Sequence, residues 1–289
     1  MELVVKKTIG LVLKNDERVS RQADDLEKWL VDNGFRVIRK ESEPPHCGLA
    51  QLEHPSAPRD LFCVVVLGGD GTFLSAVRWL RDNQVPILGV KFGEVGFMAE
   101  AAQERLFSVV ENILSQPFAT QPRMRLKVDV WKEKERVASE AILNDVVINK
   151  GALARLALIK TYVNDNFLTD YRADGLIIAT PTGSTAYSLA AGGPIIHPSV
   201  PGILVTPICP FTLTNRPLIV PDSSSIKIKL EQKSADIMLT FDGQVGLPID
   251  DRHTIIMRKD PRPVNMIVLP DRHYFDVLKT KLRWSGSRL

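Results

Sequence analysis

The sequence of 289 residues has few cysteines, little net charge and no long apolar run. Its three cysteines, Cys47, Cys63 and Cys209, lie far apart without the spacing of metal ligands, which favours free thiols in a reducing compartment. The net charge of +3 is too weak to indicate nucleic acid or a membrane surface as a partner. No stretch approaches the ~18 apolar residues of a membrane span, and residues 1–13 lack the features of a targeting segment. We therefore expect a soluble cytoplasmic protein.

Several common catalytic patterns are missing as well. The five histidines are scattered and never recur at ligand spacing, so a histidine zinc site is not expected. There is no G-x-S-x-G nucleophile elbow and no Walker A lysine motif. The main glycine-rich turn also lacks the G-x-G-x-x-G spacing of dinucleotide dehydrogenases, which counts against hydride transfer.

The first 121 residues alternate strand-like and helix-like segments, which predicts an α/β domain with a Rossmann-like parallel sheet. The segment 43–60, rich in Pro, His and Ser, is expected to be a loop. The expected strands are 9–13, 36–38, 61–67 and 85–90, and the expected helices are 18–33, 72–81 and 106–114.

Residues 122–269 consist of short strand-like segments with alternating apolar and polar side chains, punctuated by Pro and Gly. This pattern predicts an all-β domain, an antiparallel sandwich or folded sheet. The C-terminal segment 270–289 is expected to form a helix at 275–284 that returns to the first domain. The expected strands of the second domain are 126–131, 139–148, 156–163, 176–179, 226–230, 237–241 and 254–258.

The stretch Val64-Val65-Val66-Leu67 ends in Gly68-Gly69-Asp70-Gly71-Thr72, and helix-like sequence follows. Glycines let backbone N–H groups approach phosphate oxygens, and the start of a helix adds its positive dipole end. Asp70 would then be the one carboxylate among phosphate-binding amides, where it could act as a general base or organise a magnesium ion. The alternative is a tight Asp-Gly turn between two strands, without a functional role.

A second group of residues runs from Tyr171 to Gly193 and is rich in glycine and hydroxyl side chains. Five Ser and Thr side chains lie between Thr180 and Ser188. We expect a short helix at 183–191, whose first amides could meet a phosphate or a ribose. The alternative is a capped helix with a solvated Ser/Thr-rich turn.

Two polar residues, Asn144 and Asp145, interrupt an apolar strand predicted at 141–148. Because unpaired buried polar groups are unfavourable, they must leave the sheet or find partners. The edges of a bound adenine or ribose would supply partners, as would local hydrogen bonds at a strand end or bulge. Asp242-Gly243-Gln244 is expected to be a turn after a strand, and a binding role for Gln244 is the weaker alternative.

These motifs, in this order and over nearly the whole chain, resemble the NAD kinase family. Gly68–Thr72 matches its Gly-Gly-Asp-Gly-Thr motif, Asn144-Asp145 its Asn-Glu/Asp pair, and the segments between Asp174 and Gly193 its long glycine-rich signature. The first motif is shared with lipid kinases and phosphofructokinases, whereas the long signature is specific to NAD kinases. The resemblance implies phosphorylation of the adenosine ribose 2′-hydroxyl of NAD by ATP, or in some members by polyphosphate. It also implies a divalent cation, Mg²⁺, and a homo-oligomer, a dimer or a tetramer.

The resemblance also assigns roles to individual residues. Asp70 would accept the proton of the ribose hydroxyl, Gly68, Gly69 and Thr72 would bind phosphate, and Tyr187 would stack near a base. The residues implied to bind NAD are Gly71, Asn144, Asp145, Arg155, Arg172, Asp174, Thr182, Thr185, Ala186, Tyr187, Ser188, Leu189, Ala190 and Gln244.

Two other functions remain as alternatives. A lipid kinase that shares the first motif would need an apolar acceptor groove and membrane association, and the Ser/Thr-rich second signature argues against both. A dinucleotide sensor without catalysis would be favoured if Asp70 could not approach the ribose. The presence of a candidate base argues against the sensor.

Overall fold

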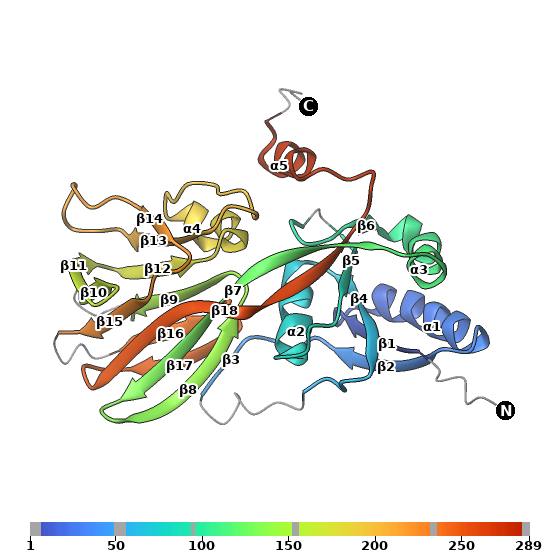
Figure 1. The fold of residues 1–289 in the computed structure, drawn as a ribbon, viewed down its shortest axis with the longest axis horizontal. Helices are drawn as coiled ribbons and strands as arrows, with labels where there is room; N and C mark the ends of the chain where they lie inside the picture. Colours follow the sequence, from blue (N-terminus) through green and yellow to red (C-terminus); the bar gives the residue numbers. More distant parts are fainter. Residues whose placement is uncertain (1–6, 49–55, 94–95, 152–155, 232–235, 285–289) are drawn as a thin grey trace. The chain divides into compact units, whose positions relative to one another are not determined.

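Figure 1 shows the fold of the chain in a computed structural model, which describes residues 7–48, 56–93, 96–151, 156–231 and 236–284. The chain divides into two units by its internal contacts. Unit 1 consists of Met1–Glu43, Pro55–Pro122 and Val264–Leu289, and unit 2 consists of Pro44–His54 and Arg123–Pro263. Two long strands, β7 (Ala119–Lys132) and β18 (His253–Val268), contribute residues to both units.

Unit 1 contains the parallel sheet that the alternating pattern predicts. The order of its strands is β2-β1-β4-β5, and every neighbouring pair is parallel. β4 lies inside this sheet, and its residues from Cys63 to Leu67 are all buried, which is typical of a strand covered on both faces. The strands are β1 (Thr8–Leu13), β2 (Arg36–Glu41), β4 (Leu61–Gly68), β5 (Ile87–Lys91) and the short β6 (Ala101–Ala102), which pairs with β5.

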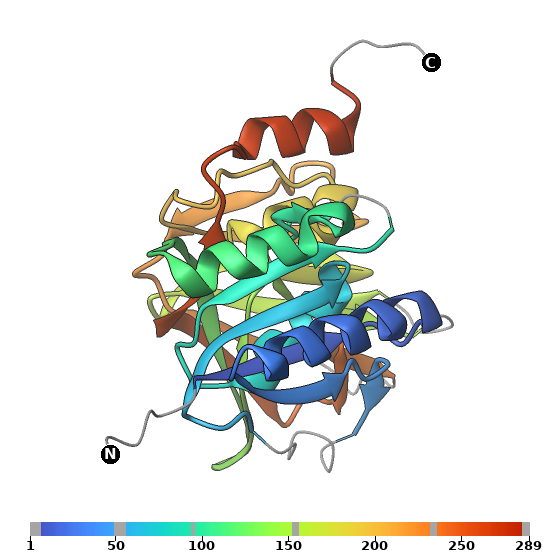
Figure 2. The ribbon, with the colours of Figure 1, turned by 90° about the vertical axis from the view of Figure 1, so that its right-hand side faces the viewer.

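Helices cover both faces of this sheet. α1 (Glu17–Asp32) and α3 (Leu106–Ser115) lie on the face that Figure 2 turns toward the viewer, where their apolar residues share one core with β1 and β4. α2 (Asp70–Leu80) packs closely on β1. The closeness is seen at Gly10 of β1, where an added Cβ would lie only 3.1 Å from the ring of Trp79 in α2. The remaining helical segments of unit 1 are η2 (Gln103–Arg105) and α5 (Tyr274–Leu282).

The ends of α1 follow from local chemistry. The carboxylate of Asp16 accepts a hydrogen bond from the Arg18 N–H at 3.0 Å and so caps the start of the helix. Gly34 follows the end of the helix with a φ of +84°, a conformation that favours glycine. The predicted helix 18–33 is therefore confirmed to within one residue at each end.

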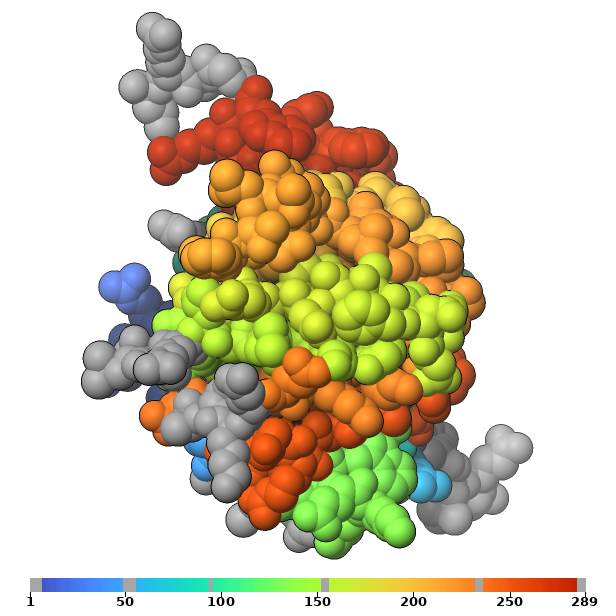
Figure 3. Space-filling model, turned by 90° about the vertical axis from the view of Figure 1, so that its left-hand side faces the viewer, coloured from blue at the N-terminus to red at the C-terminus, as the bar shows by residue number. Residues whose placement is uncertain are grey.

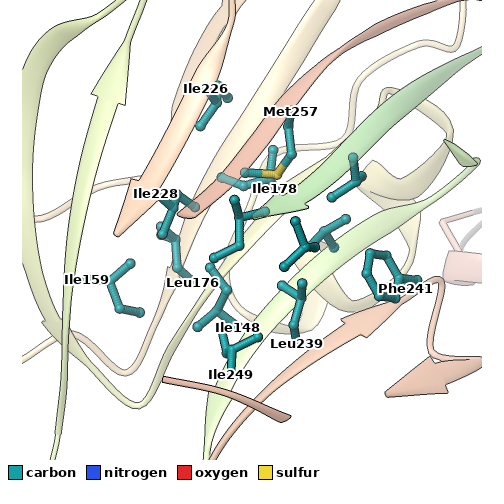
Figure 4. Close-up of a cluster of buried hydrophobic side chains, with 14 of the residues drawn as sticks. Ile148, Ile159, Leu176, Ile178, Ile226, Ile228, Leu239, Phe241, Ile249 and Met257 are labelled. Atoms are coloured by element: carbon teal, nitrogen blue, oxygen red, sulfur yellow. The ribbon is translucent and has the colours of Figure 1, made fainter. Parts of the chain in front are cut away.

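Unit 2 is a sandwich of two largely antiparallel sheets, as predicted. One sheet has the order β14-β13-β12-β9-β16-β17-β3. The other contains β11-β10-β15-β18, with β7 paired to β18 and β8 paired to β7. Figure 4 shows Ile159 and Ile228 of one sheet and Leu176 and Leu239 of the other directed into a shared apolar core. The strands are β3 (His46–Cys47), β8 (Glu135–Ile142), β9 (Asp145–Lys150), β10 (Ala157–Val163), β11 (Asn166–Ala173), β12 (Gly175–Ala179), β13 (Gly202–Ile208), β14 (Leu218–Pro221), β15 (Ile226–Leu230), β16 (Ile237–Phe241) and β17 (Val245–Ile249).

Three expectations about unit 2 are corrected by the structure. The strand expected at 139–148 is two strands, β8 and β9, separated at residues 143–144. The strand expected at 254–258 is the start of β18, which continues to Val268. The segment 43–60 is not entirely loop, because β3 forms within it and pairs with β17 in parallel.

The surface of unit 2 includes the hairpin of β10 and β11, yellow-green in Figure 3, where the Phe167 side chain is exposed. Within the part of the chain that the structure describes, no helix combines the length and the apolar character needed to cross a bilayer.

Candidate active site

The motif Gly68–Thr72 forms a strand, a turn and a helix. β4 ends at Gly68 and α2 begins at Asp70, so the alternative of a tight turn between two strands is wrong. Gly68 has no room for a side chain, because a Cβ there would lie 2.4 Å from Thr72 Oγ1. Gly69 and Gly71, in contrast, have no atom of the described protein within 4 Å of an added Cβ. Two glycines at the start of α2 therefore leave the backbone open to a ligand.

The carboxylate of Asp70 is held by backbone amides. Oδ2 accepts a hydrogen bond from Phe97 N and Oδ1 accepts one from Met98 N, both at 3.0 Å. A Cβ at Gly96 would lie 2.2 Å from Asp70 Oδ1, so glycine is required for this close approach. Each carboxylate oxygen can accept more than one hydrogen bond, so Asp70 can still accept a hydrogen bond from a further donor such as a hydroxyl group.

The break between β8 and β9 is produced by Asp242, which lies in the turn between β16 and β17. Its carboxylate accepts hydrogen bonds from the backbone N–H groups of Leu143 at 2.8 Å, Asn144 at 2.6 Å and Asp145 at 3.1 Å. These bonds take the place of ladder bonds and end the strand. The strand end predicted as one alternative at Asn144-Asp145 is therefore present, but its hydrogen bonds are not local, because Asp242 lies 97 to 99 residues along the chain.

The side chains of Asn144 and Asp145 are both buried, with 8% and 4% of their surface exposed. Among the described residues, Asn144 Oδ1 has no hydrogen-bond partner. Burial first, and the negative charge of Asp242 second, raise the pKa of the Asp145 carboxyl to about 7, against a hydrogen bond from the Tyr187 N–H that lowers it. Asp145 can therefore gain or lose a proton near neutral pH.

The hydroxyl-rich segment lies directly against this break. A Cβ at Gly183 would lie 2.1 Å from the carbonyl oxygen of Asn144, so the two motifs are in contact. The single helix expected at 183–191 is wrong, because the chain forms η3 (Thr182–Thr185) and α4 (Tyr187–Ala190). Ala186, between them, has a ψ of −133° that no helix contains.

The hydroxyl groups of this segment fall into two kinds. Those of Ser184 and Ser188 are buried and satisfied within unit 2, the latter by Thr206 Oγ1 at 2.9 Å. Thr185 Oγ1 donates to the Thr182 carbonyl at 3.2 Å. Thr182 Oγ1, in contrast, is buried without a hydrogen-bond partner in the described part of the chain. Tyr187 and Ala190 are exposed, whereas Ala186 and Leu189 are half-buried.

The other described residues expected to bind NAD lie in or beside strands of unit 2. The Arg172 guanidinium lies over the Phe211 ring at 5.1 Å, and the Asp174 carboxylate pairs with Lys150 Nζ at 3.3 Å. Gln244 lies in the predicted turn, where its backbone N–H donates to the Phe241 carbonyl at 2.9 Å. Arg155 lies outside the described residues.

Sequence reasoning missed the residues that hold the site. The amides of Phe97 and Met98 orient Asp70, and Asp242 orients Asn144, but each lies far along the chain from its target. The one signal available for Asp242 was its place before Gly243 in a turn, which is common to many turns.

Comparison with known proteins supports the resemblance. Residues 50–118 match the ATP-NAD kinase N-terminal domain, and residues 143–269 match the ATP-NAD kinase C-terminal domain. The NAD kinase of Desulfatibacillum aliphaticivorans is 55% identical over 283 residues, which cover 98% of this chain and 100% of that protein. The NAD kinase of Geobacter sulfurreducens is 44% identical over 284 residues, with the same coverage of 98% and 100%.

Two solved structures have a similar fold. Yeast NADH kinase complexed with NADH has a TM-score of 0.84 at 26% identity, and the match covers 98% of this chain and 89% of that chain. An NAD kinase from Archaeoglobus fulgidus in complex with ATP has a TM-score of 0.75 at 24% identity, covering 96% and 100%.

The two matched domains and the relatives named above define the protein as an enzyme of the kinase class. More specifically, the chain belongs to the NAD kinase family, whose activity is the ATP-dependent phosphorylation of NAD.

Proposed function

We propose that this enzyme transfers the terminal phosphoryl group of ATP to the 2′-hydroxyl of the adenosine ribose of NAD, which gives NADP. The observation that carries this proposal is Asp70, a carboxylate oriented by two amides at the start of a helix whose glycines are open. Family membership supports the reaction class, and the NADH bound in the similar yeast structure supports a dinucleotide as the ligand.

Asp70 is the proposed general base. A ribose hydroxyl is a poor nucleophile, and a carboxylate that accepts its proton during attack on phosphorus typically contributes 10²- to 10⁴-fold to the rate. The two bonds from Phe97 N and Met98 N restrict the rotation of the carboxylate and so direct its remaining lone pairs. Asp70 then holds the proton while the new bond between the ribose oxygen and phosphorus forms and the bond from that phosphorus to the leaving ADP breaks.

The turn before α2 is the proposed phosphate subsite. The N–H groups in the first turn of α2 have no acceptor within the helix, and together with the positive end of the helix dipole they favour negative phosphate oxygens. Gly68, Gly69 and Thr72 would lie against the phosphate, and Gly71 would lie beside the NAD ribose. Polyphosphate ends in the same chemical group as ATP, so the subsite by itself does not select between the two donors.

A divalent cation such as Mg²⁺ fits this subsite if it arrives on the phosphates. Mg²⁺ is usually held by one or two carboxylates together with substrate phosphates and water, rather than by a complete protein cage. Among the described residues, no three His, Cys, Asp or Glu side chains are grouped as metal ligands, and Asp70 is the acidic side chain in the turn. The ion would then be held by the substrate phosphates and water, which leaves Asp70 to act as the base, and the charge of the ion would offset that of the phosphoryl group.

The cluster around the strand break is the proposed NAD subsite. Asn144 Oδ1 and Thr182 Oγ1 are buried polar atoms that gain a partner if NAD supplies hydrogen-bonding groups. Asp145 would accept from a ribose hydroxyl or bind the nicotinamide side, and the exposed Tyr187 ring would stack near a base. The rest of the proposed subsite comprises Arg155, Arg172, Asp174, Thr185, Ala186, Ser188, Leu189, Ala190 and Gln244.

We further propose that the protein forms a homo-oligomer, either a dimer or a tetramer. Analytical ultracentrifugation would measure its oligomeric state.

An activity assay with one variant tests the proposal. The protein is incubated with NAD, Mg²⁺ and either ATP or polyphosphate, and NADP is detected with an NADP-specific dehydrogenase. We expect NADP from the parent protein, and a loss of about 10²- to 10⁴-fold in kcat for Asp70→Asn with little change in the affinity for NAD. Thermal unfolding of both proteins controls for misfolding.

The outcomes separate the alternatives. Equal rates in the parent and in Asp70→Asn would remove Asp70 from the mechanism. NAD binding without any turnover in the parent would instead indicate a dinucleotide sensor and reject the kinase reaction for this chain.

A further inference from the structure

Leu143 and Asn144 lie between β8 and β9, outside the strands, yet all the backbone polar groups of Leu143–Asp145 are paired. The three N–H groups donate to the Asp242 carboxylate, as described above. The three carbonyl oxygens accept from Thr180 Oγ1 at 2.5 Å, from Thr180 N at 2.8 Å and from Asp242 N at 2.9 Å, in chain order. Two residues therefore satisfy six backbone groups.

Asp242 is placed for this task by its turn. It has a φ of +49° and Gly243 has a φ of +63°, so the chain reverses at this point and the Asp242 carboxylate meets the strand break. An ionised acceptor makes stronger hydrogen bonds than a neutral one, and three N–H groups on one carboxylate use most of its capacity. Asp242 therefore has little capacity left for a ligand.

Thr180 connects the break to the hydroxyl-rich segment. Its hydroxyl donates to the Leu143 carbonyl and also accepts from Gly183 N at 3.1 Å. One side chain therefore relates the backbone of Leu143 to the turn that contains Thr182. The two orphaned atoms, Asn144 Oδ1 and Thr182 Oγ1, lie on the two segments that Thr180 joins.

We infer that Asp242 and Thr180 are positioning residues, which hold the backbone of Leu143–Asp145 so that Asn144 and Asp145 present their side chains to bound NAD. The inference rests on the proposed function of this cluster as the NAD subsite. Neither residue touches the ligand. Loss of either one is therefore expected to weaken NAD binding and to leave ATP binding nearly unchanged.

Thr180 offers a pair of variants for the test. Thr180→Val keeps the shape of the side chain and removes the hydroxyl, whereas Thr180→Ser keeps the hydroxyl. We expect Thr180→Val to raise the Kd and the KM for NAD by about 10-fold, as the loss of one buried hydrogen bond with its partner left unpaired predicts. In Thr180→Ser, the Kd and the KM for NAD should both stay within about threefold of the parent values. The KM for ATP should stay within about threefold of the parent value in both variants.

Asp242→Asn should weaken NAD binding more than Thr180→Val does. The asparagine amide keeps one acceptor oxygen, and its NH₂ group would face a backbone N–H, which is also a donor. We expect the Kd for NAD to rise by about 100-fold, since two or more bonds are lost. Asp165→Asn is the matched control: Asp165 also has a positive φ in a turn of unit 2, but its side chain pairs with Lys227 at the surface. The control should bind NAD as the parent does.

Calorimetry with NAD and steady-state kinetics together decide the outcome. An unchanged Kd for NAD in Thr180→Val would overturn the positioning role even if Asp242→Asn fails to fold. Equal increases in the KM values for NAD and ATP, with a lower midpoint of thermal unfolding, would assign Thr180 a purely structural role. A parent that binds NAD without turnover would reject the kinase reaction and leave the binding test in force, and a parent that does not bind NAD would reject both.

Discussion

Asp70 and Asp242 are both carboxylates that accept backbone N–H groups, but they are used differently. Asp70 accepts two such bonds beside glycines that are open, and it retains lone pairs for a further donor. Asp242 accepts three from consecutive residues and serves the backbone around it. The two accepted N–H groups leave Asp70 with capacity for its proposed role as a base, whereas the three on Asp242 suit its proposed role as a support of the strand break.

The two regions also differ in how tightly they are packed. At the start of α2, an added methyl group at Gly71 would meet no atom of the described residues within 4 Å beyond its chain neighbours and the backbone of its own helix. At the strand break, a methyl group at Gly183 would collide with the carbonyl carbon and oxygen of Asn144. The first region leaves space for a ligand, and the second is assembled by close contact between two segments. Substitutions that add one methyl group should therefore act differently in the two regions.

The largest effect is expected for Gly183→Ala. The added Cβ would lie 2.1 Å from Asn144 O and 2.4 Å from Asn144 C, and these backbone atoms are held by Thr180 and Asp242. We expect the free energy of unfolding to fall by about 3 kcal/mol, as overpacking against fixed atoms predicts. Urea denaturation measures this, with Gly71→Ala as the control that should be as stable as the parent or slightly more stable. Equal stability of the two variants would contradict the close contact.

A smaller effect, on activity, is expected for Gly96→Ala. The added Cβ would lie 2.2 Å from Asp70 Oδ1, and the carboxylate can rotate away because it is the end of a side chain. We therefore expect a modest loss of stability, because the hydrogen bonds from Phe97 N and Met98 N are weakened, and a kcat lower by about 10- to 100-fold, because the proposed base is displaced. Steady-state assays of NADP formation measure kcat. An unchanged kcat would mean that the orientation of Asp70 in the structure does not matter for the reaction.

The smallest effect is expected for Asp145→Asn, which should change how the free energy of unfolding varies with pH. The pKa of Asp145 rises from 3.8 to about 7 on folding, so between these values the folded state binds more protons than the unfolded state. The contribution of Asp145 to stability is therefore present at low pH and is lost as the pH rises toward 7. Relative to the parent, Asp145→Asn should gain roughly 2 kcal/mol between pH 5 and pH 8.

Urea denaturation of both proteins at several pH values checks this prediction. The two stability curves should diverge between about pH 5 and pH 7 and run parallel above it. Curves that stay parallel throughout would show that Asp145 is ionised at all of these pH values, contrary to its burial beside Asp242.

Local patterns were sufficient for part of the fold. The strands at 226–230 and 237–241 have the predicted bounds, and the strand, turn and helix around Asp70 follow from consecutive residues. β13 was missed although all of it is buried, since its sequence contains a proline and shows no alternation. β11, β14 and β17 were missed as well, and they are short or partly exposed strands whose pairing is set by distant neighbours.

The candidate site divides in the same way. The sequence by itself determined the type of each domain, the glycine turn with Asp70 and the polar interruption at Asn144-Asp145, because these features depend on neighbours along the chain. Only the tertiary structure decided that the interruption is a strand break, since the carboxylate that causes it lies 97 to 99 residues away. Hydrogen bonds over such distances form only after the sheets have assembled, and no local pattern encodes their partners.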